Sequence, residues 1–187
     1  MNNRFDILAT PISGLRIVQR KPIVDKRGYL ERLFCKDELQ SVVSGKPLVQ
    51  INHTLTEGRG IVRGMHFQYP PYADTRFVSC LTGEVFDVAV DLRNNSPTFL
   101  QWHAEILSAG NHRTFVIPEG FAHGFQSLSE TCEMLYFHTA PYNPEAEGGL
   151  NVNDPQLGIA WPLPVTGLSD RDAGHPLLHD TFSGFTP

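Results

Sequence analysis

Apolar and polar residues alternate over several short stretches of the chain, a period of two that is typical of β-strands with one buried face. Residues 84–93 show it well, with Val85, Val88 and Val90 among the apolar positions, and residues 14–20 show it near the N-terminus. Further strands are predicted at residues 47–55, 60–68, 76–83, 100–108, 112–118, 122–129 and 132–140.

Turn sequences separate these strands and favour an all-β fold. Asn-Asn-Ser-Pro occupies residues 94–97, Ser-Ala-Gly-Asn residues 108–111 and Asp-Lys-Arg-Gly-Tyr residues 25–29. Short strands that recur roughly every 8–12 residues are typical of a sandwich or barrel. Residues 35–45 have an acidic start, helical spacing and a closing glycine, which together predict one short helix.

Length and composition predict a single domain that spans residues 1–187. Hydrophobic residues make up 41% of the chain and charged residues 19%, which is ordinary for a globular protein. From about residue 141 the chain is rich in Pro, Gly, Asn and Asp. We therefore expect residues 141–187 to form a segment packed over the barrel, with a flexible end.

Charge, hydropathy and cysteine content bear on partners and location. The formal net charge is −5, whereas nucleic-acid-binding proteins usually carry a basic footprint. No apolar run approaches the ~20 residues that span a bilayer, and the N-terminus lacks the pattern of a signal peptide. Cys35, Cys80 and Cys132 form no Cys-x-x-Cys pair, which favours a reduced cytoplasmic protein. We therefore expect no nucleic-acid or membrane partner, and an anionic substrate would need a local cluster of arginines.

One stretch of the sequence carries the spacing of a metal-binding motif without its metal ligands. His66 follows Gly60, and Arg76 precedes Gly83 by seven positions, which resembles the first motif of the cupins. Gln68 and Arg76 stand where that motif has a second histidine and a carboxylate. A guanidinium cannot bind a cation, and an amide is a poor ligand for a transition metal. We expect a pocket that holds positive charge and no metal.

The second half of the pattern lies at residues 118–123, with Pro118, Gly120 and His123. The two halves together resemble the cupin motifs, which imply a double-stranded β-helix, or jelly-roll, barrel with a few short helices. His123 is either in direct contact with substrate or a packed barrel residue, and the neighbouring glycines permit close approach of backbone or ligand.

His66 is the candidate general base, because histidine exchanges protons near neutral pH. It should face the same side of its strand as Gln68, since strand side chains alternate. The alternative is a structural histidine at a strand end. The presence of both motif halves favours the functional interpretation.

Four further residues complete the candidate chemistry. Arg63 and Arg76 both fit the cavity wall, and two guanidiniums there need an anion such as phosphate or an enolate oxygen. The alternative is solvation or pairing with Asp or Glu. Tyr136 is a candidate proton donor or a packing residue. Asp172 either orients His66 or is one more acidic loop residue.

These residues together resemble the dTDP-4-dehydrorhamnose 3,5-epimerases, a metal-free branch of the cupin superfamily. The likeness runs from about residue 13 to residue 175. It rests on matching segments at residues 25–29, 49–54, 63–68, 83–99, 117–125, 135–136, 153–162 and 168–172.

The resemblance implies epimerisation beside the C4 ketone of a nucleotide-linked 4-keto-6-deoxyhexose, without metal or redox cofactor. The family's base, orienting aspartate and tyrosine acid match His66, Asp172 and Tyr136. Positions that contact phosphate or sugar match Arg27, Gln50, Asn52, Arg63, His123, Glu147 and Arg171. The resemblance also implies a homodimer in which the N-terminal strands, within residues 1–45, are exchanged. Arg27 would then reach the neighbouring subunit's site.

The chain departs from the family at Arg76, which stands where the family commonly has lysine near the ketone. Arginine keeps the charge but is bulkier and planar. The segment after Tyr136 also differs, with Pro141 next to Tyr142. The sequence therefore leaves open a 3,5-epimerase, an epimerase of C3 or C5 alone, a keto-sugar isomerase, a non-catalytic sugar-nucleotide binding protein and, as the least favoured, a metal-dependent cupin enzyme.

Overall fold

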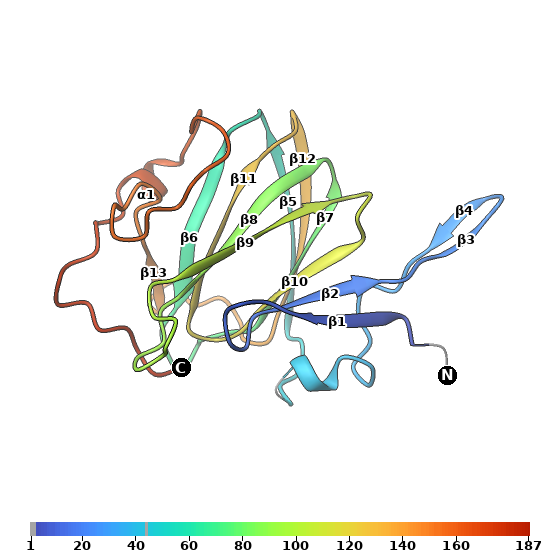
Figure 1. The fold of residues 1–187 in the computed structure, drawn as a ribbon, viewed down its shortest axis with the longest axis horizontal. Coiled ribbons are helices and arrows are strands. Elements are labelled where there is room, and N and C mark those ends of the chain that lie inside the picture. Colours follow the sequence, from blue (N-terminus) through green and yellow to red (C-terminus); the bar gives the residue numbers. More distant parts are fainter. Residues whose placement is uncertain (1–2, 44) are drawn as a thin grey trace.

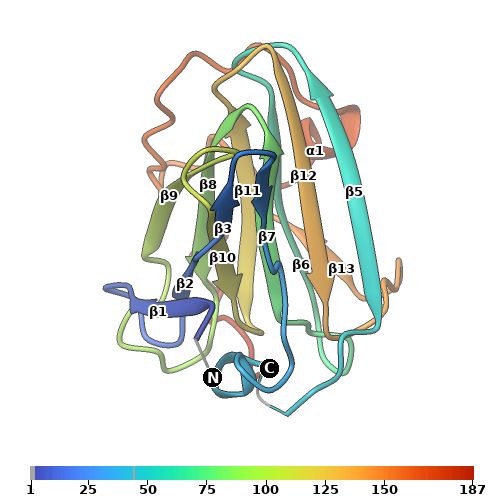
Figure 2. The same ribbon diagram turned by 90° about the vertical axis from the view of Figure 1, so that its right-hand side faces the viewer.

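The computed structural model describes residues 3–43 and 45–187, and these form two antiparallel sheets packed face to face (Figure 1; Figure 2). One sheet has six strands in the order β1-β2-β10-β7-β12-β5, and the other has five in the order β13-β6-β11-β8-β9. The strands of the six-stranded sheet are β1 Phe5–Ala9, β2 Arg16–Arg20, β10 Arg113–Ile117, β7 Arg76–Thr82, β12 Thr131–His138 and β5 Gln50–Glu57. Those of the five-stranded sheet are β13 Glu147–Gly149, β6 Val62–Gln68, β11 Phe121–Ser127, β8 Glu84–Asp91 and β9 Trp102–Ser108.

Two short strands and a short α-helix lie outside the two sheets, as does the 3-10 turn described below. Strands β3 Ile23–Asp25 and β4 Gly28–Leu30 pair with each other as a hairpin that projects away from the barrel (Figure 1). The α-helix α1, Asp170–Ala173, lies beside β6 on the opposite side of the molecule (Figure 1). No helix among the described residues is long and apolar enough to cross a membrane.

Burial explains why the strand pattern is so regular. Residues of β7, β8, β10, β11 and β12 fill the space between the sheets, where Val78, Val85, Phe115, Phe125 and Met134 are fully or almost fully buried. Burying an aliphatic or aromatic side chain of this size stabilises the fold by roughly 1.5–3 kcal/mol before the loss of conformational entropy is counted.

The C-terminal segment covers the outer face of the five-stranded sheet. Leu157, Trp161 and Phe185 pack with Val88 and Val90 of β8 in a second apolar cluster. Because β11 lies between this cluster and the inter-sheet core, every residue of β11 is buried. A third cluster, around Leu39 and Val43, covers part of the six-stranded sheet.

The predicted all-β class is confirmed, and each predicted strand overlaps an observed one. The prediction of one helix at residues 35–45 is wrong in type and length. The described part of that segment holds turns and a single 3-10 turn, η1 Gln40–Val42, with no side-chain cap; Ser44 is outside the described residues. The Glu38 carboxylate, which gave the segment its acidic start, instead accepts a hydrogen bond from the Arg4 backbone at 2.8 Å. Strands β1, β3, β4 and β13 and helix α1 were not predicted.

Candidate active site

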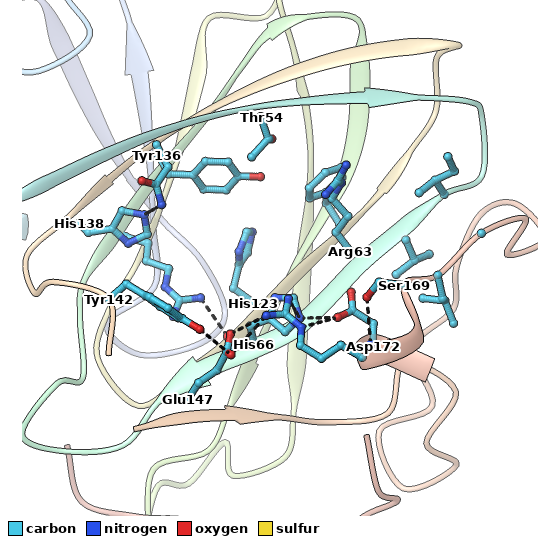
Figure 3. Close-up of a pocket in the computed structure, with 18 residues that line it drawn as sticks. Thr54, Arg63, His66, His123, Tyr136, His138, Tyr142, Glu147, Ser169 and Asp172 are labelled. Carbon is cyan, nitrogen blue, oxygen red and sulfur yellow. Dashed lines mark hydrogen bonds and ion pairs between the residues drawn. The ribbon is translucent and has the colours of Figure 1, made fainter. Parts of the chain in front are cut away.

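A cavity of about 660 Å³ opens between the two sheets, and it collects most of the polar residues that the sequence singled out (Figure 3). Strands β5, β6, β7, β11 and β12 and the segment around α1 all contribute to its wall. The predicted site residues that line it are Asn52, Arg63, His66, Arg76, His123, Tyr136, Glu147, Arg171 and Asp172. Arg27 and Gln50 do not.

Strands β6 and β11 bring the two motif histidines together. His66 and His123 are direct cross-strand partners, followed by a register shift between His123 and Phe125. Beside this pair the two strands approach so closely that a Cβ on Gly64 would lie 2.5 Å from the Gly124 Cα. The glycine at position 64, with φ of 143°, thus permits the packing that sets the two histidines side by side.

His66 and Asp172 form a hydrogen-bonded pair, with Nε2 2.9 Å from Oδ1. The other carboxylate oxygen accepts the Gly64 N–H at 3.1 Å. Helix α1 fixes the carboxylate from its own side, because the Asp172 N–H donates to Ser169 Oγ at the helix N-cap. Burial alone would raise the pKa of Asp172, but the hydrogen bonds from His66 and Gly64 outweigh it and hold that pKa well below its usual range.

Arg171 gives the His66 ring a second possible partner. Its Nη2 lies 3.0 Å from His66 Nε2, and its Nε lies 3.2 Å from Asp172 Oδ1. When Nε2 carries a proton it donates to Asp172, and when it does not it accepts from Arg171. Arg171 also contacts Glu147 Oε1 at 3.0 Å, so the mouth of the cavity carries two carboxylates for one guanidinium.

Tyr136 projects into the cavity from β12 and meets the His123 ring edge-on, with ring centroids 6.1 Å apart. Burial, reinforced by the charge of Asp87, raises the pKa of the Tyr136 phenol above its usual range, so the group remains a proton donor at neutral pH. The nearby Thr54 hydroxyl is buried without a hydrogen-bond partner among the described residues (Figure 3). Thr54 was missed, although it lies two positions beyond Asn52 on the same strand face.

His123 is anchored from behind by Asp87 of β8, with Nε2 2.8 Å from Oδ1. Asp87 is fully buried, and burial raises the pKa of its carboxyl despite the neighbouring imidazole. His123 is therefore held in one orientation on the cavity wall.

Arg63 and Arg76 differ in how their charge is compensated. Arg63 donates to Thr56 Oγ1 and the Leu55 carbonyl and has no acidic partner among the described residues. Arg76 lies 3.1 Å from a carboxylate oxygen of Asp74 and donates to the His66 carbonyl at 2.9 Å. The fixed positive charge expected from Arg76 is thus offset by Asp74, a residue that no motif in the sequence marks.

Asp74 also holds a histidine that was missed. His138 Nδ1 lies 2.7 Å from Asp74 Oδ2, and the imidazole lines the cavity. Burial acts to raise the pKa of Asp74, but Arg76 and His138 outweigh it and keep the pKa far below its usual range. The carboxylate is therefore ionised.

Two predicted contact residues lie elsewhere. Arg27 lies in the turn between β3 and β4, is exposed and 2.6 Å from Asp25, and lines neither pocket. The hairpin that carries it projects away from the barrel (Figure 1). Gln50 lines a small pocket of about 60 Å³ that shares Asn52 and His66 with the main cavity. Its Oε1 accepts the Tyr142 N–H at 2.9 Å.

One group of metal-ligating side chains occurs among the described residues, formed by His66, Asp172 and His175 with donor atoms within 4.8 Å of one another. The Arg171 guanidinium lies against two of the three, which opposes a second cation there. The His175 ring packs on Gly149 and lies edge-on to His66 at 5.8 Å. Burial and the His66 charge lower the pKa of His175, so its imidazole favours the neutral form.

Gln68, which stands where the cupin motif has a second histidine ligand, is engaged elsewhere. Its amide donates to the Tyr72 carbonyl and accepts the Asn143 N–H, which does not suit a metal ligand.

A family model described as dTDP-4-dehydrorhamnose 3,5-epimerase matches residues 9–180. The chain belongs to this family. A curated epimerase of this name from Salmonella typhimurium is 42% identical over 174 residues, covering 92% of this chain and 94% of the relative. The membership confirms the predicted enzyme class, a carbohydrate epimerase.

Solved structures of family members confirm the cupin-type fold. A dTDP-6-deoxy-D-glucose-3,5-epimerase from Legionella pneumophila, in complex with dTDP-4-keto-L-rhamnose, has a TM-score of 0.87 at 41% identity, with 92% of each chain covered. A 3'-monoepimerase from Streptomyces bikiniensis, in complex with dTDP-quinovose, has a TM-score of 0.81 at 30% identity, covering 91% of this chain and 86% of that one.

Proposed function

We propose that the protein epimerises C3 and C5 of a dTDP-linked 4-keto-6-deoxyhexose through an enolate, with His66 as base and Tyr136 as acid. The observation that carries the proposal is the combination of a carboxylate-held imidazole from β6 and a protonated phenol from β12 in one cavity. Figure 3 places them on different walls, as inversion at carbon requires.

The chemistry begins with the weakly acidic C–H bond next to the ketone. His66 accepts that proton, the electron pair moves to the ketone oxygen, and Asp172 stabilises the imidazolium that forms. Tyr136 then donates its phenolic proton to the opposite face of the carbanion, which inverts the centre and restores the ketone. The His66 imidazolium then loses its proton to solvent and the Tyr136 phenolate takes one from solvent, which resets both groups. Each positioned acid or base contributes roughly 10²–10⁴-fold to such a step.

Arg63 is the proposed partner of the substrate's diphosphate, because its guanidinium lines the cavity without an acidic partner among the described residues. Arginine suits phosphate oxygens in charge and geometry. Asn52, His123, Glu147 and Arg171 then contact the sugar or phosphates from the same cavity.

A homodimer completes the proposed site. Val24, Tyr29 and Leu30 expose apolar surface on the β3–β4 hairpin, and Ile51 and Leu55 do so on β5, the edge strand of its sheet. An exposed apolar edge is typical of a contact surface. Exchange of the N-terminal strands would cover this surface and bring Arg27 and the region of Gln50 to the substrate. The free cysteines agree with the proposed cytoplasmic location.

Subunit complementation tests the exchange. Arg27→Ala and His66→Ala chains are each made alone and then co-expressed with different tags. If Arg27 acts in the neighbouring subunit, mixed dimers hold one intact site, and random pairing restores about a quarter of the wild-type rate. A mixture no more active than its two parents would contradict the exchanged arrangement.

An epimerase of a single centre is the second candidate. The similarity to a solved 3'-monoepimerase supports it. Sequence similarity alone does not separate the two, because both kinds of enzyme are among the relatives.

Solvent deuterium incorporation into dTDP-4-keto-6-deoxyglucose, followed by proton NMR and mass spectrometry, tests the proposal. Exchange at C3 and C5 supports the 3,5-epimerase, and exchange at one carbon supports the single-centre enzyme. His66→Ala is the matched control. No exchange with this or other nucleotide-linked 4-keto sugars would refute catalysis and leave a binding protein.

A further inference from the structure

The cavity contains a second carboxylate-held imidazole in addition to His66–Asp172. His138 ends β12, and its Nδ1 lies 2.7 Å from Asp74 Oδ2. Both side chains are enclosed, with relative exposures of 14% for His138 and 2% for Asp74. A histidine held this way is fixed in both tautomer and orientation.

The geometry leaves the other ring nitrogen for the cavity. Asp74 is ionised and accepts the Nδ1 proton, so Nε2 is free to accept or donate. Its one contact among the described residues is with Asn52 Nδ2, at 3.4 Å. Alternation along β12 puts His138 on the same face as Tyr136, and the two rings are stacked at 6.3 Å.

The charges that contact His138 directly are balanced until the ring itself gains a proton, because Asp74 and Arg76 cancel at contact distance. The other titratable groups that line the same small pocket are His66 of β6, Tyr142 of the loop between β12 and β13, and Glu147 of β13, which shares Arg171 with Asp172. Protonation of His138 therefore gives the group formed by His138, Asp74 and Arg76 a net positive charge.

We propose that His138 is a catalytic residue whose protonated Nε2 donates a hydrogen bond to the ketone oxygen of the substrate as the enolate forms. The assignment rests on the proposed epimerase reaction. As His66 removes the carbon-bound proton, negative charge grows on the oxygen, and the His138 imidazolium stabilises it. When carbon is reprotonated the charge returns from the oxygen, and His138 keeps its proton, so nothing is consumed.

Opposite protonation states are then required of two histidines in one cavity. His66 must be neutral before the reaction, which gives a loss of rate as the pH falls. His138 must be protonated, which gives a loss of rate as the pH rises. Tyr136 does not supply the second limb near neutral pH, because burial raises the pKa of its phenol.

The test compares two isosteric variants across pH. In His138→Asn the amide nitrogen replaces Nδ1 and keeps the contact with Asp74, but the group that reaches the ketone oxygen is gone. In His138→Gln the amide reaches the Nε2 position as an uncharged donor. His103→Gln is the matched control, because His103 of β9 is held by a carboxylate through Nε2, Glu105 at 3.0 Å, and does not line the cavity; the glutamine amide reaches that Nε2 position and keeps the contact.

We expect His138→Asn to lower kcat for deuterium exchange about 10–100-fold with KM changed less than about threefold, and to lose the high-pH limb. His138→Gln should lie between wild type and His138→Asn in rate and should also lose that limb. Equal melting temperatures would show that both variants fold, and His103→Gln should match wild type in rate and pH profile.

Other results would overturn the assignment. A lower rate with an unchanged pH profile in both variants would make His138 a positioning residue only, and an unchanged rate would remove it from the reaction. Each of these two results is informative only when the wild-type protein exchanges deuterium. Wild type without exchange would instead refute the proposed function itself, so the two failures are distinguishable.

Discussion

Two clusters of the same three residue types contribute to the cavity and the small pocket beside it. The β6 cluster consists of His66, Asp172 and Arg171, and the β12 cluster consists of His138, Asp74 and Arg76. In each, the aspartate is almost fully buried and contacts both the imidazole and the guanidinium. The two clusters differ in the exposure of the arginine side chain, which is 52% for Arg171 and 12% for Arg76.

The environment of the arginine gives each cluster a different net charge. Arg171 is shared between Asp172 and Glu147, so two carboxylates surround one guanidinium beside His66. Arg76 has Asp74 alone as its acidic partner among the described residues. An excess of negative charge stabilises the imidazolium that a base becomes, whereas a balanced pair lets a protonated histidine provide the positive charge. Identical residue types are thus suited to opposite roles.

Replacing the base should have the largest effect. His66→Asn keeps an amide in the β6 cluster but removes the proton acceptor, so we expect deuterium exchange to fall by about 10³-fold or more. The corresponding change in the β12 cluster, His138→Asn, should cost much less. Equal losses in the two variants, measured at the same pH with substrate at saturation, would remove the distinction between the clusters.

The β6 cluster was predictable from sequence, and the β12 cluster was not. His66 belongs to a motif of fixed spacing, and Asp172 lies in a segment that matches a known family. Asp74 and His138 are 64 residues apart and belong to no motif, so their contact follows only from the antiparallel pairing of β7 with β12. The sequence did identify Arg76 as a departure, but the carboxylate that compensates it depends on the loop that precedes β7.

The same distinction applies to the fold: elements with a visible sequence pattern were predicted, and elements that depend on tertiary contacts were not. Long strands with one buried face, such as β8, were predicted because alternation is directly visible in the sequence. Strands β3, β4 and β13 have three residues each and no buried member, so they carry no such pattern. Residues 35–45 were predicted as a helix from local signals, whereas tertiary packing of Leu39 and Val43 determines their conformation.

Neutralising the two aspartates should have the next largest effect, and an unequal one. Asp172→Asn removes the charge that stabilises the His66 imidazolium, and we expect kcat to fall on the order of 10²-fold. Asp74→Asn leaves Arg76 as an uncompensated cation that can replace part of the His138 charge, so we expect a loss of about tenfold. The measurement is the rate of exchange at saturating substrate. A larger loss in Asp74→Asn would reverse the assignment of roles.

Arg76→Lys tests whether the β12 cluster needs the shape of the guanidinium. Lysine keeps the charge beside Asp74 but loses the fork that contacts both the carboxylate and the His66 carbonyl. If His138 provides the working charge, kcat should stay within about threefold of wild type. Arg76→Met, which removes the charge, is the comparison. A fall of more than tenfold in Arg76→Lys would show that the guanidinium itself acts in the reaction.

Asp91 provides a carboxylate–arginine pair outside the cavity, where we expect no effect on the rate. It is fully buried, lies 2.7 Å from Arg93 Nη2, and accepts the hydroxyls of Ser96 and Thr98 at 2.6 Å each. Burial acts to raise the pKa of Asp91, but these hydrogen bonds lower it to about 2 from the ordinary 3.8. Asp91→Asn should therefore lower the free energy of unfolding at neutral pH by about 2 kcal/mol.

The sign of this effect follows from the lowered pKa. A carboxyl that is more acidic in the folded state contributes its full stability above its unfolded pKa and loses it as the pH falls toward the folded value. Urea unfolding should accordingly show the gap between wild type and Asp91→Asn narrowing from about pH 5 to about pH 3. The exchange rate of the folded variant should equal that of wild type. If Asp91→Asn slowed exchange as much as Asp74→Asn does, the loss at Asp74 would reflect a general weakening of the barrel, and the β12 cluster would have no chemical role of its own.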